Sequence, residues 1–430
     1  MRAASLGRPA RRLALAACLG SALVAAAGSQ AACGPAPRIS AATKAEAERL
    51  RARMSLDEEA AQVLLVGVSG EGKASLASLA LLQSLPVGGV LLFGFNLPPS
   101  PEALAPLAAS LQDAAAGRAL DIPLIVALDH EGGAVFRFKG GGVTRLPPPA
   151  EVGARGPGYA RALGRAAGRE LRALGVNMAL APVVELLDDR NIEFLGNRSY
   201  GRDPARVDAA AGAFIEGLQE GGAASVAKHF PGNAAADPHR GEAVIAADRA
   251  AYERDYLPRF AAAVKRGVAA VMASHAILPA IDPERQATFS PILLNRELKG
   301  KLRFEGVVLT DDLYMKAVAK DGPPERGAVE ALAAGADLLM LSSGGGAERV
   351  RDAIVRAVEA GALPRARLDD AVRRILELKL RFDMGADLDP AVRRERQASY
   401  AGLLRENARD VARALEESRR APAAASAGSR

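Results

Sequence analysis

The strongest constraint on the fold is an alternation of short apolar runs with longer helical stretches between residues 46 and 383. Eight of the apolar runs have the length of strands, and most are continuously apolar, as expected for strands buried on both faces of a parallel sheet. They are residues 63–68, 87–94, 123–129, 177–186, 224–230, 268–275, 306–311 and 336–342. Eight strand–helix units predict an α/β fold, a single closed (β/α)8 TIM-type barrel, with an open doubly wound sheet as the alternative.

Helical patterns fill the intervals between these strands. Clear examples are residues 160–174, 203–220 and 369–382, which carry apolar residues at helical spacing. Pro204 lies just inside the start of the second helix and Gly221 follows its end, which is the usual placement of both residues.

The pattern changes after residue 385. Residues 388–417 are rich in Arg and Glu and predict a charged helix with a solvated face, and the Ala- and Ser-rich residues 421–430 predict a disordered tail. We therefore assign residues 46–385 to the barrel and residues 386–430 to the charged helix and tail. This leaves no room for a second full domain.

The N-terminal segment predicts export. In residues 1–32, four arginines precede an apolar run over residues 13–27, which is too short for a comfortable membrane span. Residues 33–45 then form a linker. We expect the mature protein to lie outside the cytoplasm, in the periplasm or at the cell surface.

The only two cysteines, Cys18 and Cys33, both lie near the N-terminus, so the mature domain has neither a disulfide nor a cysteine metal site. Cys33 follows two alanines at the cleavage region, which suits the lipidated N-terminus of a bacterial lipoprotein. Signal cleavage without lipid is the alternative.

The net charge of +6 does not predict nucleic-acid binding. Residues 1–32 contribute four arginines and no acid, which leaves +2 for the remainder. No basic run is interleaved with aromatic residues, as a nucleic-acid surface would require.

Polar residues gather at the carboxyl ends of four predicted strands. They are Asp129, the pair Lys228 and His229, the pair Ser274 and His275, and the pair Asp311 and Asp312. In a parallel barrel these strand ends form the face that carries the active site. The sequence therefore predicts a catalytic or binding site there.

Two of these segments allow more than one interpretation. Side chains alternate along a strand, so only one of Asp311 and Asp312 can face the barrel mouth, unless both merely cap the next helix. Asp237 and His239 share a face in an extended segment, so the carboxylate could orient the imidazole as a base, or His239 could be a solvated loop residue. The four histidines show no H-x-H or H-E-x-x-H spacing, so we expect no metal.

Taken in order, several motifs resemble glycoside hydrolase family 3, in its β-N-acetylglucosaminidase branch. The resemblance runs from about residue 54 to about residue 384. The matching segments are residues 54–59, 129–133 with Arg137, 144–147, 197–201, the Lys-His-Phe-Pro-Gly run at 228–232, and 306–315. Several motifs in the family's order are far more specific than any one of them alone.

This resemblance implies roles for particular residues. Asp311 would be the nucleophile, and His239, held by Asp237, would be the general acid/base. The residues that hold the hydroxyls of the terminal sugar would be Asp129, Arg137, Arg198, Lys228 and His229. The family implies a retaining, exo-acting hydrolase that releases terminal β-linked N-acetylglucosamine from cell-wall or chitin-type glycans, as a monomer and without a cofactor.

The chain departs from the family pattern at three places. Asn233 stands where the family usually has His, and Glu185 stands where it often has a shorter acid. The segment from Lys228 to His239 is about two residues shorter than the family pattern. The shortened segment keeps one alternative open, a surface lipoprotein that binds sugars without turnover. The other alternative is a β-glucosidase or β-xylosidase of the same family, although the Asp237-Pro238-His239 run and the lack of a second domain favour the amino-sugar branch.

Overall fold

The computed structural model describes most of the chain. The described residues are 39–116, 120–139, 141–319 and 322–420. The predicted export signal at residues 1–32, the lipidation at Cys33 and the predicted tail at residues 421–430 lie outside these residues.

Eight parallel strands form the central sheet, and each of them falls inside one of the eight predicted ranges. They are β1 (Leu64–Gly67), β2 (Gly89–Leu92), β3 (Ile125–Leu128), β6 (Met178–Ala179), β7 (Ala224–Phe230), β9 (Ala270–Ala273), β12 (Val307–Thr310) and β13 (Leu339–Leu341). Their order in the sheet is β12-β9-β7-β6-β3-β2-β1-β13. Apart from β1 and β13, the first and the last of the eight, neighbouring strands in the sheet are also consecutive along the chain.

The two ends of this sheet meet. Leu309 and Leu338 form a parallel bridge, and the backbone N–H of Thr310 donates to the carbonyl of Leu338 at 3.0 Å. This contact joins β12 to the segment leading into β13, which closes the sheet. The predicted single (β/α)8 barrel is confirmed, and the open sheet is not observed.

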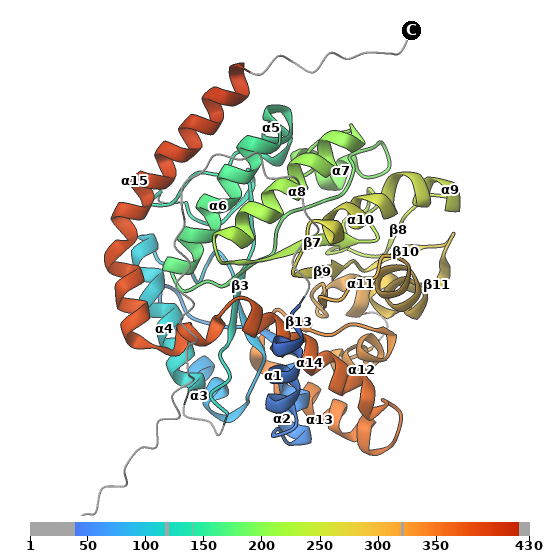
Figure 1. The fold of residues 1–430 in the computed structure, drawn as a ribbon. Helices are drawn as coiled ribbons and strands as arrows, with labels where there is room; N and C mark the ends of the chain where they lie inside the picture. Colours follow the sequence, from blue (N-terminus) through green and yellow to red (C-terminus); the bar gives the residue numbers. More distant parts are fainter. Residues whose placement is uncertain (1–38, 117–119, 140, 320–321, 421–430) are drawn as a thin grey trace, which may run out of the picture. The chain divides into compact units, whose positions relative to one another are not determined.

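A helix follows each strand and covers the outside of the sheet (Figure 1). These helices are α3 (Leu76–Ser84), α4 (Leu104–Ala115), α6 (Pro157–Ala173), α8 (Pro204–Glu220), α10 (Leu257–Lys265), the π-helix η5 (Ile292–Lys301), α12 (Pro324–Ala334) and α13 (Ala347–Glu359). The start of α8 is as predicted: Asp203 accepts a hydrogen bond from the backbone N–H of Arg206 at 2.7 Å, and Pro204 is the first helical residue.

Shorter elements complete the described chain. The helices are α1 (Ala41–Arg51), α2 (Leu56–Gln62), α5 (Pro149–Arg155), α7 (Ile192–Leu195), α9 (Arg249–Ala251), α11 (Lys316–Ala319) and α14 (Arg365–Arg381). The strands are β4 (His130–Gly132) and β5 (Val135–Phe136), which pair antiparallel, and β8 (Ala243–Val244), β10 (Ala276–Leu278) and β11 (Asp282–Gln286), which form a small second sheet. The predicted helices at 160–174 and 369–382 correspond to α6 and α14.

The charged helix predicted at residues 388–417 is α15 (Pro390–Arg420), which lies along α6 (Figure 1). It is more than a solvated helix. The buried Tyr400 donates its hydroxyl hydrogen to the carbonyl of Gly142 at 2.7 Å, and Asn407 donates to Glu170 in α6 at 2.9 Å. The helix is therefore packed onto the outer layer of the barrel.

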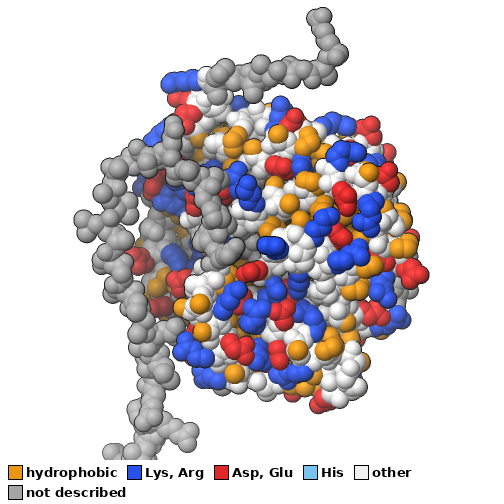
Figure 2. All heavy atoms as spheres, turned by 45° about the vertical axis from the view of Figure 1, so that its right-hand side comes forward, with side chains coloured by type: hydrophobic (Ala, Val, Ile, Leu, Met, Phe, Trp, Pro, Cys, Tyr) orange, Lys and Arg blue, Asp and Glu red, His pale blue; other side chains and the backbone are white. Residues whose placement is uncertain are grey.

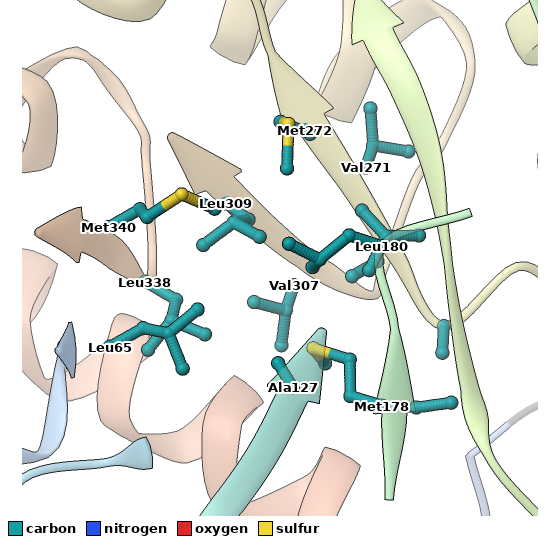
Figure 3. Packing of buried hydrophobic residues seen from close by; sticks show 14 of the residues in the cluster. Leu65, Ala127, Met178, Leu180, Val271, Met272, Val307, Leu309, Leu338 and Met340 are labelled. Carbon is teal, nitrogen blue, oxygen red and sulfur yellow. The ribbon is translucent and has the colours of Figure 1, made fainter. Parts of the chain in front are cut away.

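Branched and sulfur-containing side chains fill the barrel interior, as is usual for this fold. Figure 3 shows side chains from several strands pointing into this interior, among them Leu65, Met178, Val307 and Leu309. The interior is a packed core, so substrate can reach only the ends of the barrel. No helix in the described residues is long and apolar enough to cross a membrane.

Charged side chains of both signs are interspersed on the face drawn in Figure 2. That face therefore presents no large field of a single sign, which is what strong binding of a nucleic-acid backbone needs.

Candidate active site

Polar side chains surround the carboxyl-terminal end of the barrel, where four strands end. Asp129 follows β3, Lys228 and His229 lie near the end of β7, His275 follows β9 and Asp311 follows β12. The backbone N–H of Asp311 donates to Ala273 at 3.1 Å, which continues the pairing of β12 with β9 past the last strand residue. Every strand-end residue predicted from the sequence therefore lies on this face.

Four of the predicted sugar-binding residues belong to one ion-pair network. The Nζ atom of Lys228 lies 2.8 Å from Oδ1 of Asp129 and 2.7 Å from Oε1 of Glu131. Arg137 contacts Asp129 at 2.7 Å, and Arg198 makes two hydrogen bonds to Glu131 at 2.8 and 2.9 Å. Positive and negative groups alternate, so each charge taken out of water has opposite charges beside it.

These contacts keep the groups ionised. Burial alone would raise the pKa of Asp129 and of Glu131, but nearby cations outweigh it and hold both pKa values below their usual range. Burial would lower the pKa of Lys228, but the two carboxylates raise it. The network therefore presents charged donors and acceptors, which bind hydroxyl groups more strongly than neutral ones do.

Glu131 was missed in the sequence analysis, although it pairs with two of the predicted residues. It lies in β4, and its side chain is buried. Asp129 and Glu131 are two residues apart, and such residues share a face in extended chain. That spacing could have revealed Glu131. Its partner Arg198 lies 67 positions away in sequence, which no local pattern can show.

His229 lies in a separate buried cluster. Oε1 of Glu185 is 2.7 Å from Nδ1 of His229, accepts the backbone N–H of His229 at 3.0 Å, and accepts the amide of Asn233 at 2.9 Å. A carboxylate on Nδ1 fixes the ring and leaves Nε2 as its free nitrogen. Glu185 and Asn233, two of the departures from the family pattern, thus contact each other and act on the same predicted residue.

Asp311 and Asp312 have different surroundings. Oδ1 of Asp312 accepts the backbone N–H of Ser342 at 2.8 Å and that of Tyr314 at 3.2 Å, so this carboxylate ties the end of β12 to the chain after β13. Asp311 is half-buried, accepts only the adjacent N–H of Asp312 at 2.8 Å, and has no ion-pair partner within the described residues. Of the two, Asp311 is the carboxylate available for chemistry.

His275 hydrogen-bonds to the segment that carries Asp311 and Asp312. It is fully buried, and its Nε2 lies 3.0 Å from the carbonyl oxygen of Asp312, while Nδ1 lies 2.9 Å from the hydroxyl of Thr288. Burial lowers the pKa of His275 and favours its neutral form, in which Nε2–H donates to that carbonyl. His275 thereby positions the peptide between Asp312 and Leu313, directly after Asp311.

His239 lies on the loop between β7 and β8. Its Nδ1 is 2.8 Å from Oδ1 of Asp237, which also accepts its backbone N–H at 2.9 Å. Burial would raise the pKa of Asp237, but these hydrogen bonds lower it, so the carboxylate stays ionised and leaves Nε2 of His239 as the reactive nitrogen.

This loop is attached to the connection that follows Asp311. The carbonyl of Pro238 accepts a hydrogen bond from the backbone N–H of Ala317 in α11, at 3.3 Å. The charges of Asp311 and His239 both influence the pKa of His275, with Asp311 raising it and His239 lowering it. No hydrogen bond joins His239 to Asp311 among the residues that the structure describes.

The fold and the site together define a class of protein. Active sites of (β/α)8 barrels are built at the carboxyl ends of the strands, where this chain places an unpaired carboxylate, an imidazole oriented by a second carboxylate, and charged groups that can hold hydroxyls. Such a combination is that of a barrel enzyme that cleaves glycosidic bonds by acid/base and nucleophilic catalysis.

The chain belongs to glycosyl hydrolase family 3, because the model of the family's N-terminal domain matches residues 55–378. It is 37% identical over 287 residues to a β-hexosaminidase of Nitrosomonas eutropha, which covers 65% of this chain and 80% of that protein. It is 36% identical over 264 residues to a β-hexosaminidase of Methylococcus capsulatus, which covers 59% of this chain and 75% of that protein. The predicted family and enzyme class are thus confirmed.

Solved structures show the same likeness. A family 3 β-N-acetylglucosaminidase from a Paenibacillus species superposes with a TM-score of 0.73 at 36% identity, covering 77% of this chain and 63% of that one. The chain thus spans less than two thirds of that relative. A β-N-acetylhexosaminidase from Beutenbergia cavernae gives a TM-score of 0.69 at 30% identity, covering 76% of this chain and 98% of that one.

Proposed function

We propose that this chain is a retaining, exo-acting β-N-acetylhexosaminidase that removes terminal β-linked N-acetylglucosamine from amino-sugar glycans. The observation that carries the proposal is the unpaired carboxylate of Asp311 at the end of β12, with the Asp237–His239 pair on a loop hydrogen-bonded to the following helix. The names of the similar proteins favour this activity over β-glucosidase, β-xylosidase or sugar binding without turnover.

In the first step Asp311 attacks the anomeric carbon and forms a glycosyl-enzyme intermediate. His239, protonated on Nε2, gives its proton to the leaving oxygen as the glycosidic bond breaks. The hydrogen bond from Nδ1–H to Asp237 stabilises the imidazolium and keeps Nε2 directed away from that carboxylate. Because the base of this pair is neutral, it does not repel the anionic nucleophile.

In the second step His239 removes a proton from water, which attacks the anomeric carbon and frees Asp311. Two displacements at one carbon retain its configuration. Throughout both steps, the network of Asp129, Lys228, Arg137 and Arg198 holds the hydroxyls of the terminal sugar. The charges in that network are already paired, so binding requires little rearrangement of the protein.

The test compares the wild-type enzyme on an aryl β-N-acetylglucosaminide and on the matched aryl β-glucoside. We expect kcat/KM to be much higher on the amino sugar, and NMR of the first product to show the β anomer. A higher rate on the glucoside would contradict the substrate assignment, and an α product would contradict the double displacement. Binding of N-acetylglucosamine with no hydrolysis of either substrate would contradict the enzyme itself.

We also propose that the mature enzyme is a monomer outside the cytoplasm, held to a membrane by lipid on Cys33. Four arginines, an apolar run and two alanines before Cys33 support this proposal. An exported enzyme would meet cell-wall or chitin-type glycans directly. Mass spectrometry of the mature N-terminus tests the anchor, because an unmodified first residue would contradict it.

A further inference from the structure

An open groove of about 750 Å³ lies at the rim of the barrel, beside the site described above. Its walls come from the chain after β1, from α3, from the chain after β13 and from the start of α13. Leu81 supplies an apolar wall, and the exposed side chains of Ser69, Ser343 and Arg349 supply hydrogen-bonding groups. Apolar lining with a few polar groups is typical of ligand-binding sites.

Phe95 lies at this groove and is the one exposed residue among the phenylalanines and tyrosines in the described part of the chain, at 60% exposure. Its ring stacks on Phe93 with the centroids 5.6 Å apart and the planes only 10° from parallel. The stack fixes one face of Phe95 against the protein. The ring is thus held as a flat apolar platform in contact with solvent, and its free face can stack on a ligand.

The groove is continuous with the proposed catalytic residues. Ser342, which lines it, donates its backbone N–H to Asp312, the neighbour of Asp311. The segment that carries Phe95 also lies close to the sugar-binding network. A Cβ atom built on Gly94, the residue before Phe95, would be 3.8 Å from Cδ of Arg137. The groove therefore adjoins both the neighbour of Asp311 and the sugar-binding network, within reach of a glycan held at Asp311.

We infer that this groove binds the leaving-group side of the glycan, with the ring of Phe95 stacked on the apolar C–H face of a pyranose. The inference rests on the proposed function, because it concerns the same substrate. A pyranose presents C–H groups on its flat face and hydroxyls around its edge. The ring of Phe95 can pack against the C–H groups, and the side chains of Ser69, Ser343 and Arg349 can hydrogen-bond to the hydroxyls.

The experiment measures kcat/KM for wild type and Phe95→Ala on two substrates that share the terminal N-acetylglucosamine. One is N,N′,N″-triacetylchitotriose, and the other is the β-glycosyl fluoride, whose one-atom leaving group cannot reach Phe95. An aromatic stacking contact contributes about 0.5–1.5 kcal/mol, so Phe95→Ala should lower kcat/KM on the trisaccharide roughly three- to tenfold. On the fluoride it should change less than about twofold, within the range for surface substitutions.

Two further variants make the result specific. Phe95→Tyr keeps the flat ring and should restore wild-type kinetics on the trisaccharide. Leu76→Ala removes an exposed apolar side chain that does not line the groove, so it should leave both substrates unaffected. An equal loss on both substrates in Phe95→Ala, or no loss on the trisaccharide, would overturn the subsite. Failure of the wild type on the fluoride would instead refute the proposed function, so the two failures are distinguishable.

Discussion

At the scale of single residues, Asp311 and Asp312 show how neighbours of one type acquire different roles. Asp312 accepts hydrogen bonds from the backbone N–H of Ser342, after β13, and from that of Tyr314, two residues further along, whereas Asp311 accepts only the N–H of the next residue. A carboxylate that is occupied by backbone donors contributes to stability. One that is half-exposed and without a counterion is available to react.

This difference leads to a paired prediction. Asp311→Ala should lower kcat at least about a thousandfold, because the covalent step is lost, without lowering the free energy of unfolding. Asp312→Ala should instead destabilise the fold by about 1–3 kcal/mol, because two partly buried backbone donors lose their acceptor. Kinetics and urea unfolding of both variants check this. An Asp311→Ala enzyme with near-wild-type kcat would show that another group is the nucleophile.

The proton-transfer role of His239 depends on the leaving group. His239→Ala should lower kcat/KM on N,N′-diacetylchitobiose by about 10²–10⁴, the usual contribution of general acid catalysis. On a dinitrophenyl glycoside, whose leaving group needs little proton assistance, the loss should be much smaller. Equal losses on both substrates would contradict an acid role for His239.

At the scale of elements, the hairpin of β4 and β5 separates two adjacent residues onto different sides. Glu131 faces the ion-pair network, while His130 packs against the rings of Phe136 and Phe138. Nδ1 of His130 is buried with no hydrogen-bond partner in the described residues. Burial lowers the pKa of His130 to about 4, so the folded protein keeps this ring neutral.

This burial makes stability depend on pH. The unfolded chain binds a proton at His130 near pH 6.5, and the folded chain binds it only near pH 4. The contribution of neutral His130 is therefore complete above pH 6.5 and falls by about 3 kcal/mol as the pH drops to 4. His130→Leu should flatten the decline of unfolding free energy between pH 7 and pH 4. Parallel curves for wild type and variant, measured by urea titration, would show that His130 titrates normally.

Local sequence patterns predict helices and strands well where the spacing of apolar residues is regular. The range predicted for β7 is the observed Ala224–Phe230. The prediction of residues 177–186 as one strand is too long, since β6 is only Met178–Ala179 and Pro182 soon follows without an N–H to donate. The small sheet of β8, β10 and β11 was not predicted, because Asp282–Gln286 in β11 is polar and because β8 and β10, which pair with each other, are far apart in sequence.

At the scale of the whole molecule, the barrel and its active face could be predicted, because eight repeated units and polar strand ends are local signals. The interaction partners of the predicted site residues could not be predicted. Glu131 with Arg198, Glu185 with His229, and α15 with α6 each join segments that only the completed fold brings together. Local sequence patterns therefore identify the candidate residues, but not the hydrogen-bond and ion-pair partners that hold those residues in place.

The helix α15 is part of this completed fold, and removing it tests its contribution. A chain that ends at Asp389 loses the buried Tyr400 and leaves Glu170 without Asn407. We expect the unfolding free energy to fall by at least about 3 kcal/mol, since removing one buried aromatic side chain alone costs about that much. A chain that ends at Arg420 is the control and should unfold like the full chain. Equal stability of both truncations would show that α15 contributes little.

The four histidines of the chain differ in how far solvent can reach them. His130, His229 and His275 are buried, whereas the side chain of His239 is 63% exposed. An acylating reagent selective for imidazole, such as diethyl pyrocarbonate, should therefore modify one histidine in the folded enzyme and inactivate it. N-acetylglucosamine in the solution should slow that inactivation by covering the ring. Peptide mapping would identify the modified residue. Titration with one reagent would then measure the fraction of active enzyme in a wild-type preparation.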